Sequence, residues 1–133
     1  MVDAEESIVA MIPYWLTAAL QSGISAIQRK VFALNGIFIP AHINRPANGL
    51  FAQLGFIPPD LQFDALEFTG RTTAQAVRAA YQLNPELTLI SNSDAHFPEQ
   101  IGASHSVFYM NDCSFAEIHK ALRQQEGRSV HTK

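Results

Sequence analysis

The sequence has little positive charge and almost no cysteine. Its single cysteine, Cys113, cannot form a disulfide within the chain, so a reducing cytoplasm is the simplest location. The net charge is −3 and the pI is near 5.9. Because this gives no basic surface for phosphates, we expect no stable binding of duplex nucleic acid. The first residues, "MVDAEES", lack the positive charge of a secretory signal peptide.

Several motifs that would indicate a common enzyme class are also missing. The sequence contains no glycine-rich phosphate loop, no serine-centred nucleophile elbow and no Cys-x-x-Cys pair. It also lacks an uninterrupted membrane-spanning run. The apolar stretch from Ile8 to Ile27 contains Pro13 and is split by "QSGIS". We therefore interpret this stretch as two short helices of a soluble core.

What is present fits one globular domain. The chain has 133 residues, of which 47% are hydrophobic. We expect a helical segment over residues 1–35 and an α/β core over residues 36–133. Four strands that are apolar throughout alternate with helices, which predicts parallel pairing with both sheet faces buried. Predicted helices cover residues 4–21, 22–36, 50–54, 71–85 and 114–127, and predicted strands cover residues 37–39, 63–70, 87–96 and 105–111.

Polar residues follow three of these strands. His42 comes after the first strand, Glu67 lies near the end of the second, and Asp94 and His96 end the third. In α/β folds, ligands bind beyond the carboxyl ends of parallel strands. The positions of these residues therefore predict one shared functional site.

The residue types at this site are typical metal ligands. In an extended segment residues two apart point to the same side, so Asp94 and His96 can face one site together. A carboxylate and an imidazole suit Zn, Mn or Fe, and His42 could supply a further ligand. The alternative is that Asp94 caps a turn and His96 is an ordinary loop histidine.

Two further residues are candidates for contact with a substrate. Glu67 could orient a histidine, contact the substrate or simply face solvent. Arg45 follows His42 closely and could hold a phosphate or a carboxylate in a fork of hydrogen bonds, although a surface arginine would look the same.

Two long segments carry a family resemblance. "GIFIPAHINRPANGLFAQLGFIPPDLQFDALEFTG" and "LISNSDAHFPEQIG" resemble the second half of PHP proteins, the polymerase and histidinol phosphatase superfamily. The "PAH", "ALE" and "SDAH" motifs match in order, and the resemblance covers about Asn35 to Gly102. It implies a distorted β/α barrel and a two- or three-metal site that hydrolyses phosphoesters. It also implies that His42, Asp94 and His96 are metal ligands and that Arg45 faces the substrate phosphate, and it leaves the role of Glu67 open.

The sequence departs from the PHP pattern at its start. PHP domains begin with a strand that ends in His-x-His, whereas no histidine precedes His42 here. With four predicted strands, the chain resembles the C-terminal half of a barrel that typically needs roughly 250 residues. We expect the C-terminal portion of a metal-dependent phosphoesterase, incomplete on its own; a non-catalytic binding or oligomerisation module is the alternative. The implied cofactor is a divalent transition metal (Zn, Mn or Fe).

The expected partners follow from the same resemblance. They are a phosphorylated small molecule or a short oligonucleotide as substrate, and a second copy of the chain or a missing N-terminal half. We expect no membrane association.

Overall fold

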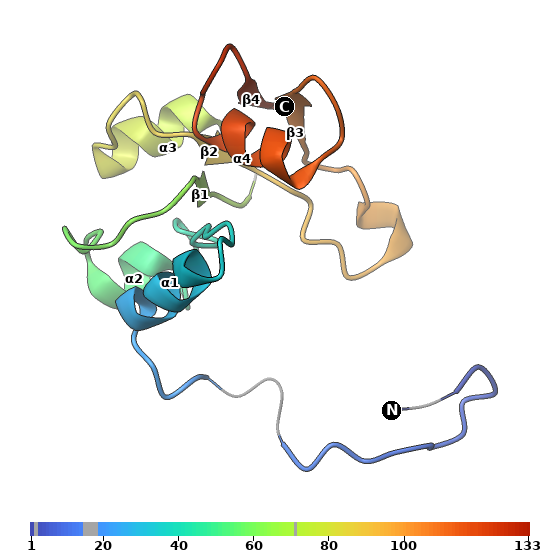
Figure 1. The fold of residues 1–133 in the computed structure, drawn as a ribbon. Helices are drawn as coiled ribbons and strands as arrows, with labels where there is room; N and C mark the ends of the chain where they lie inside the picture. The colour runs from blue at the N-terminus through green and yellow to red at the C-terminus, as the bar shows by residue number, and fades with distance from the viewer. Residues whose placement is uncertain (2, 15–18, 71) are drawn as a thin grey trace.

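The protein has a mixed α/β fold with short strands (Figure 1). The structure is a computed structural model that describes residue 1 and residues 3–14, 19–70 and 72–133. Along the chain the elements are α1 (Ile24–Ala33), α2 (Leu50–Leu54), β1 (Leu66–Glu67), α3 (Ala74–Tyr81), β2 (Leu89–Ile90), the 3-10 helix η1 (Pro98–Gln100), β3 (Ser106–Tyr109), α4 (Phe115–Leu122) and β4 (Ser129–Thr132).

The strands form two separate pairs. Strands β1 and β2 are parallel, with Leu66 opposite Leu89. Strand β3 instead pairs antiparallel with β4 at the C-terminal end of the chain. The prediction of four mainly parallel strands is therefore wrong. The sequence pattern missed β4, which pairs with β3 although α4 separates the two strands in the chain.

The predicted strand 37–39 is an extended segment that runs beside β1. The amide of Asp64 donates to the carbonyl of Phe38 at 2.9 Å, and the amide of Glu67 donates to the carbonyl of Pro40 at 3.0 Å. The amide of Ile43 then donates back to the carbonyl of Glu67 at 2.9 Å. These bonds place the residues after this segment next to the carboxyl end of β1.

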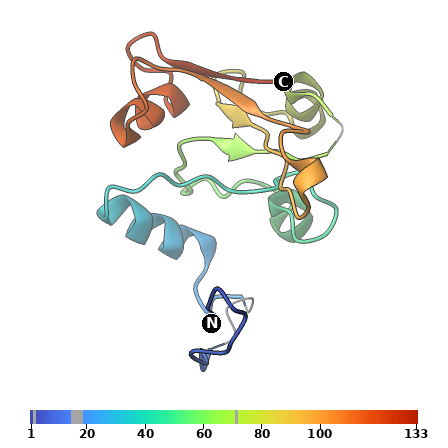
Figure 2. The same ribbon diagram turned by 90° about the vertical axis from the view of Figure 1, so that its right-hand side faces the viewer.

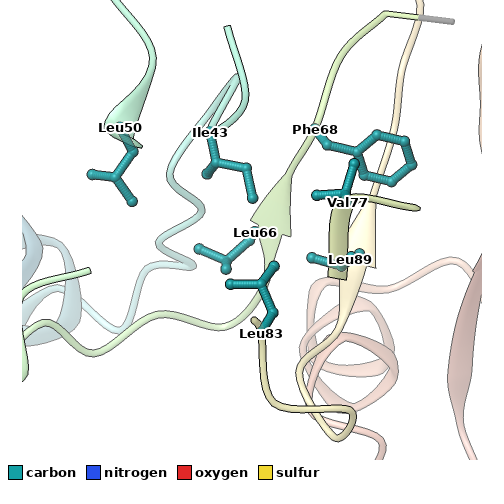
Figure 3. Close-up of a cluster of buried hydrophobic side chains, with 7 residues drawn as sticks. All are labelled: Ile43, Leu50, Leu66, Phe68, Val77, Leu83 and Leu89. Carbon is teal, nitrogen blue, oxygen red and sulfur yellow. The ribbon is translucent and has the colours of Figure 1, made fainter. Parts of the chain in front are cut away.

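The parallel pair is buried on both faces, as apolar strands predict. Leu66 and Leu89 point into one hydrophobic cluster, which Figure 3 shows. Ala65 and Ile90 point into a second cluster. This opposition follows from the two-residue side-chain period of strands. The second cluster also contains Leu122 of α4, so α4 covers one face of the pair.

The predicted helices are confirmed except at the N-terminus. Thr73 caps α3 by accepting from the amide of Ala76, and Ser114 caps α4 by accepting from the amide of Glu117. The predicted helix 4–21 is wrong for its described residues, 4–14 and 19–21, which have no helix; residues 15–18 lie outside the described part. The N-terminal segment extends away from the body (Figure 2). None of the helices in the described part of the chain is long and apolar enough to cross a membrane.

Candidate active site

A short loop brings His42 to the carboxyl end of β1. Ile43 anchors this loop because its side chain is fully buried in the first hydrophobic cluster. The side chain of Asn44 then bonds both main-chain groups of Thr69, accepting from its amide at 2.9 Å and donating to its carbonyl at 2.7 Å. The loop is therefore fixed to the segment that follows β1.

The imidazole of His42 lies between two carboxylates. Its Nδ1 is 3.5 Å from Oε2 of Glu67, and its Nε2 is 3.5 Å from Oδ2 of Asp94. The Nδ1 atom is buried and has no hydrogen-bond partner among the described residues. The structure thus brings together three of the predicted residues, from the loop after segment 37–39, the end of β1 and the loop after β2.

Arg45 joins this group through Asp94. Its Nη2 donates to Oδ2 of Asp94 at 3.0 Å, and the two side chains are 45% and 35% exposed. A half-exposed guanidinium at the rim retains donors for an incoming anion.

His96 lies further out than the other predicted residues. Its side chain is 76% exposed, and its Nε2 is 4.0 Å from Oδ1 of Asp94. The backbone of Asp94 has φ 47°, so this stretch is not an extended strand and the argument from two-residue spacing does not apply. The side chain of Gln100 instead positions His96, by accepting from its amide at 2.8 Å.

Two of the site residues have unusual backbone conformations. His42 has φ 51° and Asp94 has φ 47°, both in the left-handed region. Six other described residues besides glycine share this region, among them the helix C-cap Gln82, so the conformation alone does not mark a functional site.

The sequence interpretation missed two amide side chains that organise the site. Asn92 donates from Nδ2 to Oε1 of Glu67 at 3.0 Å, which leaves Oε2 facing His42. Asn44 fixes the loop that carries His42, as described above. The one sequence signal for both was their position within two residues of a candidate residue.

The donor set fits part of a metal site. No group of three or more His, Cys, Asp or Glu side chains in the described ranges is arranged to hold a metal ion on its own. Imidazole and carboxylate are nevertheless the ligands that Zn, Mn and Fe accept, and the buried Nδ1 of His42 lacks a partner.

The C-terminal region matches a known protein family. The model of the PHP-associated family matches residues 72–126, which contain Asp94 and His96. The uncharacterized protein YqxK of Bacillus subtilis (strain 168) is 30% identical over 132 residues, covering 87% of this chain and 34% of that protein. The resemblance to PHP proteins is thereby confirmed.

Two solved structures are similar to most of the chain. The crystal structure of the lesion-specific endonuclease PfuEndoQ from Pyrococcus furiosus has a TM-score of 0.66 and 26% identity, and covers 80% of this chain and 28% of that chain. A structure of Endonuclease Q in complex with a 27-mer duplex, with an abasic lesion at the active site, has a TM-score of 0.62 and 26% identity, and covers 79% of this chain and 28% of that chain. The chain thus spans about a third of the length of these relatives.

These structures overturn the expectation of no duplex nucleic-acid binding. That expectation rested on the net charge of −3, whereas a similar structure holds a DNA duplex at its active site. Net charge is a sum over the whole surface, but contact with a phosphate depends on the local potential at the site.

Proposed function

This chain carries a PHP-associated region in residues 72–126, and from this premise we propose that it contributes one side of the active site of a metal-dependent phosphoesterase that acts on DNA. One observation carries the proposal. The His42 imidazole lies 3.5 Å from both Glu67 and Asp94, so three separate segments of the chain meet at one point. The segment 38–43 with β1 and β2 would form part of a distorted β/α barrel.

Each site residue has a role in this proposal. His42, Asp94 and His96 would hold a divalent transition metal (Zn, Mn or Fe), which when bound supplies Lewis-acid stabilisation of the charge that develops on the phosphate. Glu67, which accepts from Asn92, would orient His42, because its Oε2 lies 3.5 Å from Nδ1.

Arg45 would bind the scissile phosphate. Its guanidinium already uses Nη2 on Asp94, and its remaining N–H groups are available at the rim of the site. The similar structure that holds an abasic duplex at its active site supports DNA as the substrate class.

The proposal is tested by binding of a fluorescent duplex that carries one abasic site. Anisotropy is measured with Mn²⁺ and with EDTA, for the wild type, His42→Ala and Asp94→Asn. We expect Mn²⁺ to tighten binding by roughly tenfold or more in the wild type and to have little effect in either variant. His131→Ala is the matched control, because this exposed histidine lies on β4 and contacts Tyr109. Equal Mn²⁺ dependence in the wild type and both site variants would refute the proposal.

A non-catalytic binding module is the second candidate. The ion pair between Arg45 and Asp94 favours it, because a carboxylate that already has a cationic partner has less charge to offer a metal. This candidate predicts duplex binding that is the same with Mn²⁺ and with EDTA and that is weakened by Arg45→Ala.

A further inference from the structure

A second group of charged side chains lies at the other end of β1. Asp64 precedes β1 by two residues, whereas Glu67 of the candidate active site ends the strand. The Asp64 side chain is fully buried, and its Oδ2 accepts from the amide of Phe38 at 2.8 Å. Its Oδ1 lies 3.0 Å from Nε2 of His119 and accepts from Nε of Arg123 at 2.7 Å. One buried carboxylate therefore holds two basic side chains one helical turn apart: His119 on α4 and Arg123, the residue that follows its last turn.

Arg123 keeps donor groups that Asp64 does not use. Arg123 bonds Asp64 through Nε, so its two terminal Nη groups have no hydrogen-bond partner among the described residues, and its side chain is 41% exposed. His119 directs Nε2 at Asp64 and is 33% exposed; its Nδ1 faces away from that bond and donates only when both ring nitrogens carry protons. Because Asp64 fixes both groups, a ligand that binds them would immobilise little additional side-chain freedom.

These donors face a cavity of about 430 Å³ between the end of α1 and α4. Figure 2 shows α1, in blue, and α4, in orange-red, on the same side of the molecule. None of the described residues that line the cavity is acidic. Its size lies within the range of roughly 300–1,000 Å³ that small-molecule sites occupy.

Two aromatic rings form walls of the same cavity. The guanidinium of Arg123 lies 6.0 Å from the ring centroid of Phe32. The ring of Phe115 is 57% exposed and lies 6.5 Å from the His119 ring. An exposed ring near a fixed guanidinium is suited to stacking against a planar group that is attached to an anion.

We propose that this cavity, which we call the α1–α4 cavity, binds a nucleotide, with its phosphate at Arg123 and His119 and its base against Phe115. Shape and charge both support this assignment: Arg123, His119 and Phe115 line the same cavity, and the rings of His119 and Phe115 lie 6.5 Å apart. The phosphate accepts from the free Nη groups of Arg123 in the forked geometry that guanidinium favours. The site is separate from the candidate active site, because it lies at the amino end of β1.

The proposal is tested by titration with dAMP, with binding monitored by ligand-observed NMR and by calorimetry. We expect saturable binding that Arg123→Gln weakens by about tenfold or more, since a charge-assisted hydrogen bond is lost. Phe115→Ala should weaken it by about fivefold or more through loss of stacking. Because Phe115 is exposed, this second variant keeps the test valid even if Arg123→Gln fails to fold.

Two controls separate this site from general charge effects and from the active site. Arg29→Gln removes the same charge from an exposed position on α1 and should leave dAMP binding unchanged. His42→Ala should also leave it unchanged. A 5′-phosphorylated single-stranded tetranucleotide shows whether the natural ligand is a DNA strand or a free nucleotide. Tighter binding of the tetranucleotide than of dAMP indicates a DNA strand, and equal binding indicates a free nucleotide. Absence of saturable dAMP binding, or equal binding by Arg123→Gln, Phe115→Ala and the wild type, would overturn the proposal.

Discussion

Glu117 and Arg128 form a two-pronged ion pair that connects α4 to the start of β4. Nε of Arg128 donates to Oε2 of Glu117 at 2.8 Å, and Nη2 donates to Oε1 at 3.1 Å. The amide of Asn111 also donates to Oε2 at 2.9 Å. The bonds from Arg128 and then that from Asn111 lower the pKa of Glu117 from 4.5 to about 2. This pair therefore ties together the helix and both strands of the antiparallel pair.

The first prediction concerns the stability of Glu117→Gln. A lowered carboxyl pKa contributes stability that is fully present above pH 4.5 and is lost as the pH falls towards about 2. The variant should therefore melt at a lower temperature than the wild type at neutral pH. The difference should shrink as the pH falls through this window. Circular dichroism melts measure it, with the exposed Glu99→Gln as control. A constant difference across the window would contradict the assignment.

The second prediction concerns Gly49, the residue before α2. A Cβ atom there would lie against the carbonyl oxygen of Arg45 and 2.8 Å from both the Arg45 nitrogen and the His42 oxygen. Gly49→Ala should shift the loop that carries His42 and Arg45, cost about 1–3 kcal/mol of unfolding free energy and weaken Mn²⁺-dependent duplex binding.

Gly23→Ala is the matched control for this prediction. Gly23 precedes α1 in a similar extended conformation, and a Cβ there has no atom within 4 Å. Denaturant unfolding of the two variants isolates the steric effect from the loss of glycine at a helix start. Equal stability of the two variants would show that the loop tolerates the added methyl group.

Much of the fold could be predicted from local patterns in the sequence. The helix at Leu50–Leu54 and the cap at Ser114 follow from periodicity and from capping chemistry, which act over a few residues. The placement of His42, Glu67 and Asp94 together also follows, because the carboxyl ends of adjacent parallel strands meet.

The remaining features depend on contacts that periodicity does not encode. Strand β4 forms because β3 offers it an edge, which is a long-range pairing. The left-handed backbone of His42 and Asp94 is set by the surrounding loops, since neither residue type requires it. The bond from Asn92 to Glu67 joins residues 25 positions apart. Burial of Asp64 with two basic partners from α4 likewise has no local signal.

The third prediction concerns Arg45→Ala and rests on the proposed function. Arg45 and Asp94 are both substantially exposed, so their ion pair should contribute only about 0–1 kcal/mol to stability. Its loss frees Oδ2 of Asp94 and removes a nearby positive charge. We therefore expect tighter Mn²⁺ binding and weaker duplex binding in the same variant, with a nearly unchanged melting temperature. Arg29→Ala is the control for net charge. Weaker Mn²⁺ binding by Arg45→Ala would show that Arg45 supports the metal ligands and does not compete for Asp94.

The fourth prediction ranks the two histidines as metal ligands. His42 is 24% exposed and held between two carboxylates, whereas His96 is 76% exposed and lies 4.0 Å from Asp94. A ligand that must first be immobilised contributes less net affinity, because it loses rotamer freedom on binding. His42→Ala should therefore weaken Mn²⁺ binding by about tenfold or more, and His96→Ala by only a few-fold.

Calorimetric titration of both variants gives this ranking, and melting temperatures give an independent readout. Since Nδ1 of His42 is buried without a hydrogen bond, removing it relieves a desolvation cost, and His42→Ala should lose little stability. A large loss of stability in His42→Ala would mean that this histidine supports the fold. A larger effect of His96→Ala on Mn²⁺ affinity would mean that the exposed loop closes over the metal and supplies its dominant ligand.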